Sequence, residues 1–165
     1  MSSNPLPTSG FDVPPWFYAD LSAAVCHPTL RDLLQHWESL KDGGDLPKAS
    51  RIDPLNLRPH LGDLFMVRVD HEGQTFTYSL IGTRITDILD RDTTGRRVEE
   101  TFPAGHPVLD VYKLIYQRRV PVRTHGQLNW VDKDYKRFES LMMPLVDDAG
   151  TVIKILGAAI YFSDP

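Results

Sequence analysis

The sequence predicts an α+β fold in which one antiparallel sheet is interrupted by a single helical region. Residues 64–69 and 75–80 show a period of two, which is typical of strands with one buried face. Apolar residues then recur at helical spacing within residues 106–118. Three further strands joined by short turns follow, up to Tyr161. We therefore expect two strands, a helical region and three strands, in that order.

The N-terminal part is predicted to be a tail followed by an amphipathic helix. Residues 1–15 are rich in Pro, Ser and Gly, which is typical of a mobile tail, and the apolar residues within 16–25 are expected to dock on the domain. Thr29 resembles a helix N-cap, and Gly43-Gly44 would end the helix. The helix carries one apolar stripe, made of Leu30, Leu33, Leu34, Trp37 and Leu40. This stripe either covers the sheet of its own chain or forms the interface of a homodimer.

The chain is expected to divide into three parts. Residues 1–28 form the tail and docking segment, 29–62 a helical extension, and 63–165 the core. Within the extension, Asp53-Pro54 resembles an N-cap followed by proline at the first helical position. This pattern predicts a short helical turn just before the first core strand.

Caps and turns mark the elements of the core. Thr83 is predicted to cap a helix that runs to about Leu89, and His106-Pro107 to start the main helix. The last strand, residues 152–161, is apolar on both faces, as expected for a central strand that is covered on each side.

Three segments carry a resemblance to a known family: Leu46–Pro54, Tyr78-Ser-Leu-Ile-Gly-Thr83 and Asp92-Thr-Thr-Gly95. They resemble those of bacterial proteins made of one PAS domain with an N-terminal helical extension. The resemblance spans residues 29–162. It implies a five-stranded antiparallel sheet of order 2-1-5-4-3, with helices on one face and the N-terminal helix covering the other face or dimerising. It also implies a sensory or regulatory module without naming a ligand.

Composition sets limits on the class of protein. The 165 residues are 41% hydrophobic and 24% charged, which indicates a soluble domain with a real core. The net charge of −4 argues against nucleic acid as a partner. The sequence has no apolar stretch near the roughly 20 residues of a membrane span, and its first ten residues lack the pattern of a signal peptide. We therefore expect a cytoplasmic protein with no membrane partner.

The cysteine and the histidines are the residues that could hold a flavin, a haem or a metal ion. A flavin photoadduct is not expected, because residues 83–100 contain no cysteine and the only one, Cys26, lies in the extension. A haem is not expected either, although His106 and His125 are the candidates by position. The six histidines show no spacing typical of a metal site. No nucleophile motif is present, so we predict that the protein is not an enzyme; a cavity-based enzyme is the remote alternative.

A small-molecule pocket is predicted between the inner sheet face and the helices, where PAS domains hold ligands. Gly126, Gly157 and Ala159 are small where a core would favour bulk, which could leave space for a small apolar ligand. The opposite interpretation is that large aromatic side chains fill this space as ordinary core. The predicted lining residues are Phe76, Tyr78, Tyr112, Ile115, Tyr116, Thr124, Leu128, Phe138, Met142, Ile155, Gly157 and Ala159.

The sequence therefore predicts a non-enzymatic sensory module that binds a small molecule, a partner protein or both in signal transduction. The alternative is a free-standing interaction or dimerisation module with a filled core. The chain ends soon after its last predicted strand, at Pro165, so we expect any output to pass through association with an unidentified signalling protein.

Overall fold

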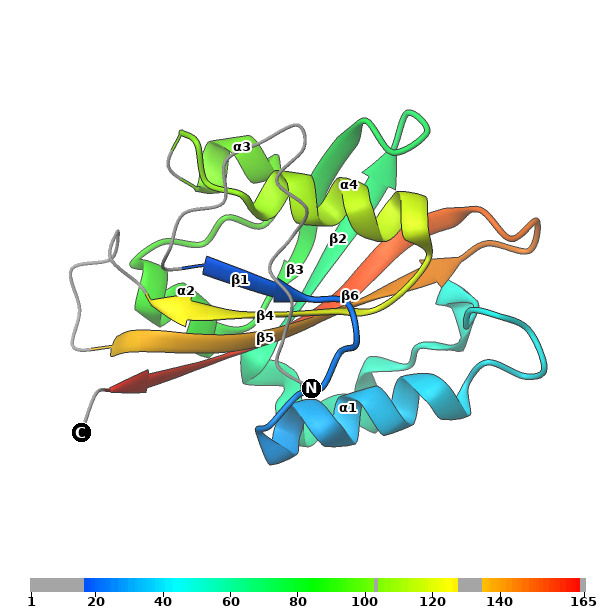
Figure 1. Cartoon of the computed structure of the whole chain (residues 1–165), viewed down its shortest axis with the longest axis horizontal. Helices are drawn as coiled ribbons and strands as arrows, with labels where there is room; N and C mark the ends of the chain where they lie inside the picture. Colours follow the sequence, from blue (N-terminus) through cyan, green and yellow to red (C-terminus); the bar gives the residue numbers. More distant parts are fainter. Residues whose placement is uncertain (1–16, 103, 128–134, 164–165) are drawn as a thin grey trace.

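The structure, a computed structural model, describes residues 17–102, 104–127 and 135–163. One antiparallel sheet of six strands, in the order β1-β4-β5-β6-β2-β3, forms the centre of the molecule (Figure 1). The strands are β1 Phe17–Asp20, β2 Leu64–Asp70, β3 Thr75–Ile81, β4 Val122–Gln127, β5 Tyr135–Val146 and β6 Val152–Ser163. The predicted order 2-1-5-4-3 corresponds to β3-β2-β6-β5-β4 and is confirmed.

The sheet contains one strand that the sequence did not predict. β1 pairs with β4, from Phe17 opposite Gly126 to Asp20 opposite Arg123, and so extends the sheet from five strands to six. Phe17 and Ala19 are buried in the inner core, whereas Tyr18 between them is exposed. This alternation is the period-two pattern of a strand, but over only four residues it is too short to distinguish from a docking segment.

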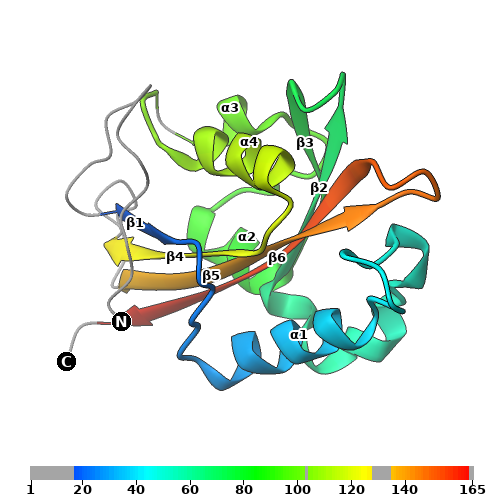
Figure 2. The ribbon, with the colours of Figure 1, turned by 45° about the vertical axis from the view of Figure 1, so that its right-hand side comes forward.

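Within the described residues, three helices lie on the inner face of the sheet. They are α2 Thr83–Leu89, α3 Val98–Thr101 and α4 Val108–Arg118. In Figure 1, α3 and α4 lie above the sheet, and Figure 2 shows α4 foreshortened over the same face. The amphipathic helix α4 buries Val111, Tyr112 and Ile115 against the strands, because these positions fall on one side of a helix.

The outer face carries the N-terminal extension. Helix α1, Pro28–Ser39, lies under the sheet in Figures 1 and 2, followed by the short helices η1 Ala49–Arg51 and η2 Pro54–Asp63. Trp37 is 1% exposed, and its indole Nε1 donates a hydrogen bond to the Pro144 carbonyl oxygen on β5 at 2.9 Å. A large aromatic side chain with a satisfied polar atom thus fixes the helix on the sheet.

The start of α1 is held by a buried carboxylate on β5. Glu139, 4% exposed, accepts hydrogen bonds from the backbone N–H groups of Cys26 and His27, each at 2.8 Å. It also accepts one from Arg123 Nε at 2.6 Å. Burial alone would raise the pKa of Glu139, but these hydrogen bonds and the Arg123 charge outweigh it and lower the pKa.

Two predicted caps are shifted in the structure. The N-cap of α1 is His27, whose Nδ1 accepts from the Thr29 N–H, so Thr29 lies inside the helix. The N-cap of α2 is Gly82, and Thr83 is its first residue. Position 82 requires glycine because the backbone of Gly62 lies very close to it. A Cβ on residue 82 would collide with that backbone.

Candidate functional site

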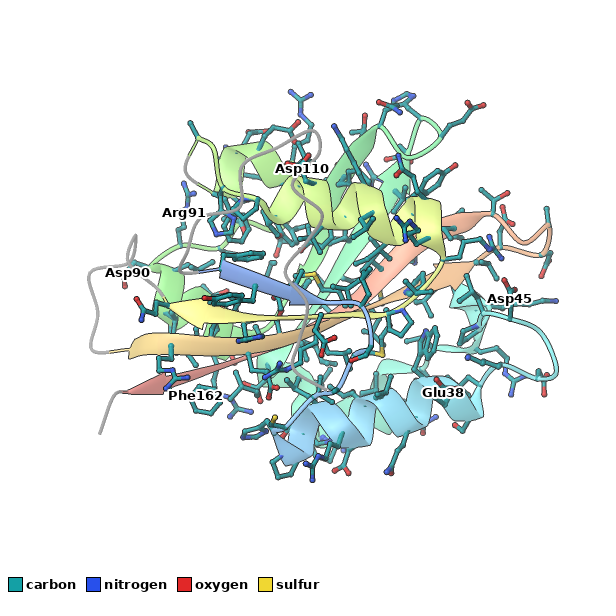
Figure 3. All side chains as sticks on the ribbon, in the orientation of Figure 1. Glu38, Asp45, Asp90, Arg91, Asp110 and Phe162 are labelled. Atoms are coloured by element: carbon teal, nitrogen blue, oxygen red, sulfur yellow. The ribbon has the colours of Figure 1, made fainter. Side chains whose placement is uncertain are left out.

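A cavity of about 60 Å³ lies between the inner face of the sheet and helices α2, α3 and α4. Figure 3 shows side chains from α4 and from the sheet meeting in this layer. The cavity is lined by Phe17, Phe65, Tyr78, Ile81, Ile85, Leu89, Thr93, Thr101, Phe102, His106, Val108, Tyr112, Thr124, Phe138, Ser140, Met142, Ala159 and Tyr161. None of these side chains is an acid, a lysine or an arginine, so the lining favours a neutral ligand.

A pair of hydroxyls on β4 and β5 forms part of the sheet wall. Thr124 stands directly opposite Ser140 in the strand register, and both side chains are buried. Their hydroxyls are hydrogen-bonded to each other. Ala159 is opposite Ser140 on β6, and its small side chain leaves room beside the pair.

A second hydroxyl pair joins the sheet to α4. Tyr78 on β3 and Tyr112 on α4 are 3% and 1% exposed, and their oxygens are 3.0 Å apart. Burial raises the pKa of both phenols, and the pKa of Tyr78 is raised further by Tyr112. Both groups are therefore protonated at neutral pH, and one of them has a hydrogen available for a ligand.

Thr93 brings an unpaired hydroxyl to the cavity. Its side chain is 0% exposed, and its Oγ1 has no hydrogen-bond partner in the described part of the chain. The surrounding loop is fixed on β3, because Gly95 N–H donates to the Tyr78 carbonyl at 2.7 Å and Tyr78 N–H donates to that of Arg96 at 3.0 Å. A buried hydroxyl without a partner is costly, so this atom is the strongest indication of a bound molecule or water.

His106 contributes a neutral ring at the edge nearest α3. Burial lowers its pKa to about 4, so the imidazole is uncharged at neutral pH. Its Nδ1 accepts a hydrogen bond from the Val108 N–H at 3.2 Å, which assigns the ring proton to Nε2. The ring packs against Phe102 at 4.6 Å and Phe17 at 5.5 Å between centroids.

The structure brings six of the predicted pocket residues to the cavity. They are Tyr78, Tyr112, Thr124, Phe138, Met142 and Ala159. Phe76, Ile115 and Ile155 belong instead to the solid core around it, and Leu128 lies outside the described residues.

Two other predicted pocket residues have different neighbours. Tyr116 lies over the turn between β2 and β3, where its ring covers Gly73. Gly157 does not open space: the ring of Phe65 occupies the position that a side chain there would take.

Several lining residues were not predicted to belong to the site. Thr93 lies in the Asp92–Gly95 segment, which stands out in the sequence only for its family resemblance, and its unpaired hydroxyl has no signature in sequence. Phe17 reaches the cavity because β1 joins the sheet. Phe65 also lines the cavity. It is paired with Gly157 in the register between β2 and β6, and its ring lies over this glycine.

The two haem candidates lie on opposite faces of the sheet. His106 lines the cavity, whereas His125 stacks on the exposed Tyr18, on the outer side. A cofactor of flavin or haem size needs a pocket of roughly 300–1,000 Å³, so the cavity as it stands does not fit either group. Cys26 is exposed and is not among the lining residues. In the described parts of the chain, no cluster of three or more potential metal ligands occurs.

The apolar stripe of α1 faces the sheet. Leu30, Leu33 and Trp37 are buried against the outer face, in one cluster with Leu141 and Leu156. Leu34 on the same helix is half-buried, and so is Leu40, which is the C-cap and lies just past the end of α1. No helix among the described residues combines the length and apolar character needed to cross a membrane.

A sheet with helices across one face and a small cavity beneath them is the architecture of a PAS domain. The sequence matches the PAS domain family over residues 25–160, and the chain belongs to this family. Its domains serve as sensory modules. No curated protein matches the sequence.

Two solved structures are similar in shape. One is the light state of the LOV domain of the blue-light photoreceptor Aureochrome1, at 11% identity and a TM-score of 0.45, covering 66% of this chain and 88% of that one. The other is an RNA-binding Light-Oxygen-Voltage receptor, at 14% identity and a TM-score of 0.48, covering 71% of this chain but only 36% of that one. At these values neither likeness carries an inference about ligand or partner.

Proposed function

We propose that the protein is a sensory module that binds one small, neutral molecule in the cavity and transmits its presence to another protein. The observation that carries this proposal is the unpaired Thr93 hydroxyl, completely buried beside about 60 Å³ of space. A ligand with a hydrogen-bonding oxygen or nitrogen would satisfy this hydroxyl and offset the cost of its burial.

The size of the cavity limits the ligand. An apolar cavity of about 150 Å³ accepts benzene, so one of about 60 Å³ accommodates only a few non-hydrogen atoms unless its walls move. The remaining polar groups are hydroxyls and one neutral imidazole, which support reversible binding of an uncharged molecule over acid–base catalysis.

The proposal is tested by comparing protein purified from its own host with protein from an expression host. Native mass spectrometry of the first sample should show a retained small molecule, and its thermal midpoint should be higher. Ligand at 100 times its dissociation constant stabilises a protein by about 2.7 kcal/mol. A bare polypeptide mass together with equal midpoints would contradict the proposal.

A matched pair of variants tests whether the molecule binds in the cavity. Ala159→Val adds bulk to the cavity wall and should abolish both the extra mass and the added stability. Ala149→Val, at an exposed position in the turn between β5 and β6, should leave both unchanged. Retention of the molecule by the Ala159 variant would show that it binds elsewhere.

A second candidate function is self-association or partner binding through the outer face. Tyr18 is 39% and Phe162 37% exposed, and both lie on that side of the sheet. Figure 3 labels Phe162 at the end of β6, away from the main length of α1. Exposed aromatic side chains are enriched at interfaces. If this candidate is correct, Phe162→Ser should lower the sedimentation coefficient measured at high protein concentration; an unchanged monomeric value for both proteins would exclude self-association.

A further inference from the structure

The sheet leaves one side of β6 uncovered near its end. β2 pairs with β6 only as far as Leu64 opposite Ala158, while β5 accompanies β6 to Ser163. Before Leu64 the chain belongs to η2, which packs on the outer face of the sheet and does not continue the strand pairing with β6. Among the described strands, residues 159–163 of β6 therefore have a neighbour on the β5 side alone.

A surface groove of about 330 Å³ occupies this gap. Its walls come from the end of η2, from α2, from β6 and from the N-cap of α1. The lining residues are His27, Asp63, Arg84, Asp87, Ile88, Ile160 and Tyr161. Arg84 donates two hydrogen bonds to the Asp63 carboxylate, at 2.7 and 3.0 Å, and so bridges α2 to η2 at the rim.

Tyr161 is the residue that the groove and the cavity share. It lines both spaces, and its side chain is half-buried. The pKa of Tyr161 is raised by burial and, to a smaller extent, by the charge of Asp63 on the groove side. On the cavity side, Tyr161 in turn raises the pKa of Tyr78 and of Tyr112. The phenol therefore stands between the rim of the groove and the hydroxyl pair of the cavity.

The Tyr161 side chain is held by packing. Within the described residues, its hydroxyl makes no hydrogen bond, in contrast to Tyr78 and Tyr112. A rotation about the side-chain torsions would carry the ring into the groove, which is open to solvent. Such a movement breaks no strand pairing, since the backbone of Tyr161 stays paired with Phe138.

We propose that the groove between η2, α2 and β6 is the entrance to the cavity and that the Tyr161 ring is its gate. This inference rests on the proposed function, because a gate requires a guest. Five other residues of the cavity lining are half-buried: Ile81, Leu89, Phe102, His106 and Phe138. Phe102 and His106 have their rings in mutual contact, 4.6 Å apart between centroids. Opening there would require several aromatic side chains to move together.

Xenon is a suitable probe, because it enters small apolar cavities without needing a hydrogen bond. The methyl group of Met142, a buried lining residue, reports its arrival by NMR in the full chain labelled with 13C at methionine methyls. The association rate follows from the exchange broadening of this signal during a xenon titration.

Variants distinguish the two edges. Tyr161→Ala should raise the association rate at least tenfold, and Tyr161→Phe should leave it within twofold. Phe102→Ala removes an aromatic ring at the opposite edge and should also leave the rate within twofold. Asp87→Trp, at an exposed position on the groove wall, should lower the rate without disturbing the core, and it keeps the test decisive if Tyr161→Ala does not fold.

The outcomes separate the gate from the proposed function. If xenon shifts Met142 but Phe102→Ala accelerates its entry while the Tyr161 and Asp87 variants do not change it, the gate is wrong and the cavity still binds a guest. If Met142 does not shift in the wild type or in Val108→Ala, which enlarges the cavity, both proposals are contradicted.

Discussion

Single residues in the cavity wall decide how stable the empty domain is. Thr93→Val replaces a buried, unpaired hydroxyl with a methyl of the same shape, so we expect it to stabilise the ligand-free protein by about 1 kcal/mol. Thr101→Val is the matched control: that hydroxyl donates to the Arg97 carbonyl at 3.3 Å, so its removal should destabilise by a similar amount. Urea unfolding of ligand-free samples measures both. Equal signs for the two variants would contradict the assignment of Thr93 as unpaired.

The contact between Gly157 and Phe65 leads to a second prediction at this scale. Gly157→Ala places a Cβ where the Phe65 ring now lies, and overpacking of this kind costs about 1–3 kcal/mol. Gly44→Ala is the control, since a Cβ there is at an ordinary distance of 3.4 Å from the Lys41 oxygen. The free energy of unfolding, measured in urea, should fall for the first variant only. An unchanged value would mean that Phe65 moves freely.

At the scale of elements, the start of α1 depends on the charge of Glu139. The hydrogen bonds and the Arg123 charge lower the pKa of Glu139 in the folded state, so the carboxylate stabilises the fold at pH values above its pKa in the unfolded chain. This stability should be lost as the pH falls below about 4.3, toward the lower pKa of the folded state.

Glu139→Gln tests this attachment. The variant should lose about 2 kcal/mol of stability at pH 7, the value typical of hydrogen bonds to a charged group, and should show a weaker further loss between pH 5 and pH 3 than the wild type. Urea midpoints across this range provide the measurement, and hydrogen exchange of the Cys26 and His27 amides should accelerate in the variant. Parallel pH profiles for the two proteins would mean that Glu139 is not the group that titrates.

At the scale of the whole molecule, the position of α1 bears on the oligomeric state. Leu33 is 1% exposed against the sheet of its own chain, so Leu33→Ala should cost about 2–5 kcal/mol without changing the sedimentation coefficient. Leu34→Ala, at a half-buried position on the same helix, should cost clearly less. A dimer that dissociates in the Leu33 variant, with its unfolding free energy preserved, would assign the stripe to a subunit interface instead.

The architecture could be predicted from sequence because it depends on periodicity and order. The alternation in β2 and β3 and the two-sided apolar character of β6 specify which strand is central, and the family motifs then fix the order of the sheet. β1 could not be recognised, because only Phe17 and Ala19 face inward and two positions do not establish a period. The structure has a cavity between the layers where the sequence predicts a pocket, and only part of the predicted lining reaches it.

The details of the cavity depend on contacts between strands and between layers. A glycine in a strand suggests space, yet the space beside Gly157 is taken by a ring from the neighbouring strand. The Thr93 hydroxyl is unpaired because no neighbouring group in the described part of the fold is placed to form a hydrogen bond with it, and the sequence does not contain this geometry. Such features can be known only from the folded structure.

The alternation of side chains along β5 has a consequence for communication across the sheet. Ser140 faces the cavity, and its hydroxyl is hydrogen-bonded to that of Thr124. The preceding residue, Glu139, points to the other face and accepts hydrogen bonds from the two amides just before the N-terminal helix. The two faces are thus connected by one peptide bond. A ligand that separates the two hydroxyls would displace Ser140, which is adjacent to Glu139. A structural change at the cavity could therefore reach the N-terminal helix through these two neighbouring residues.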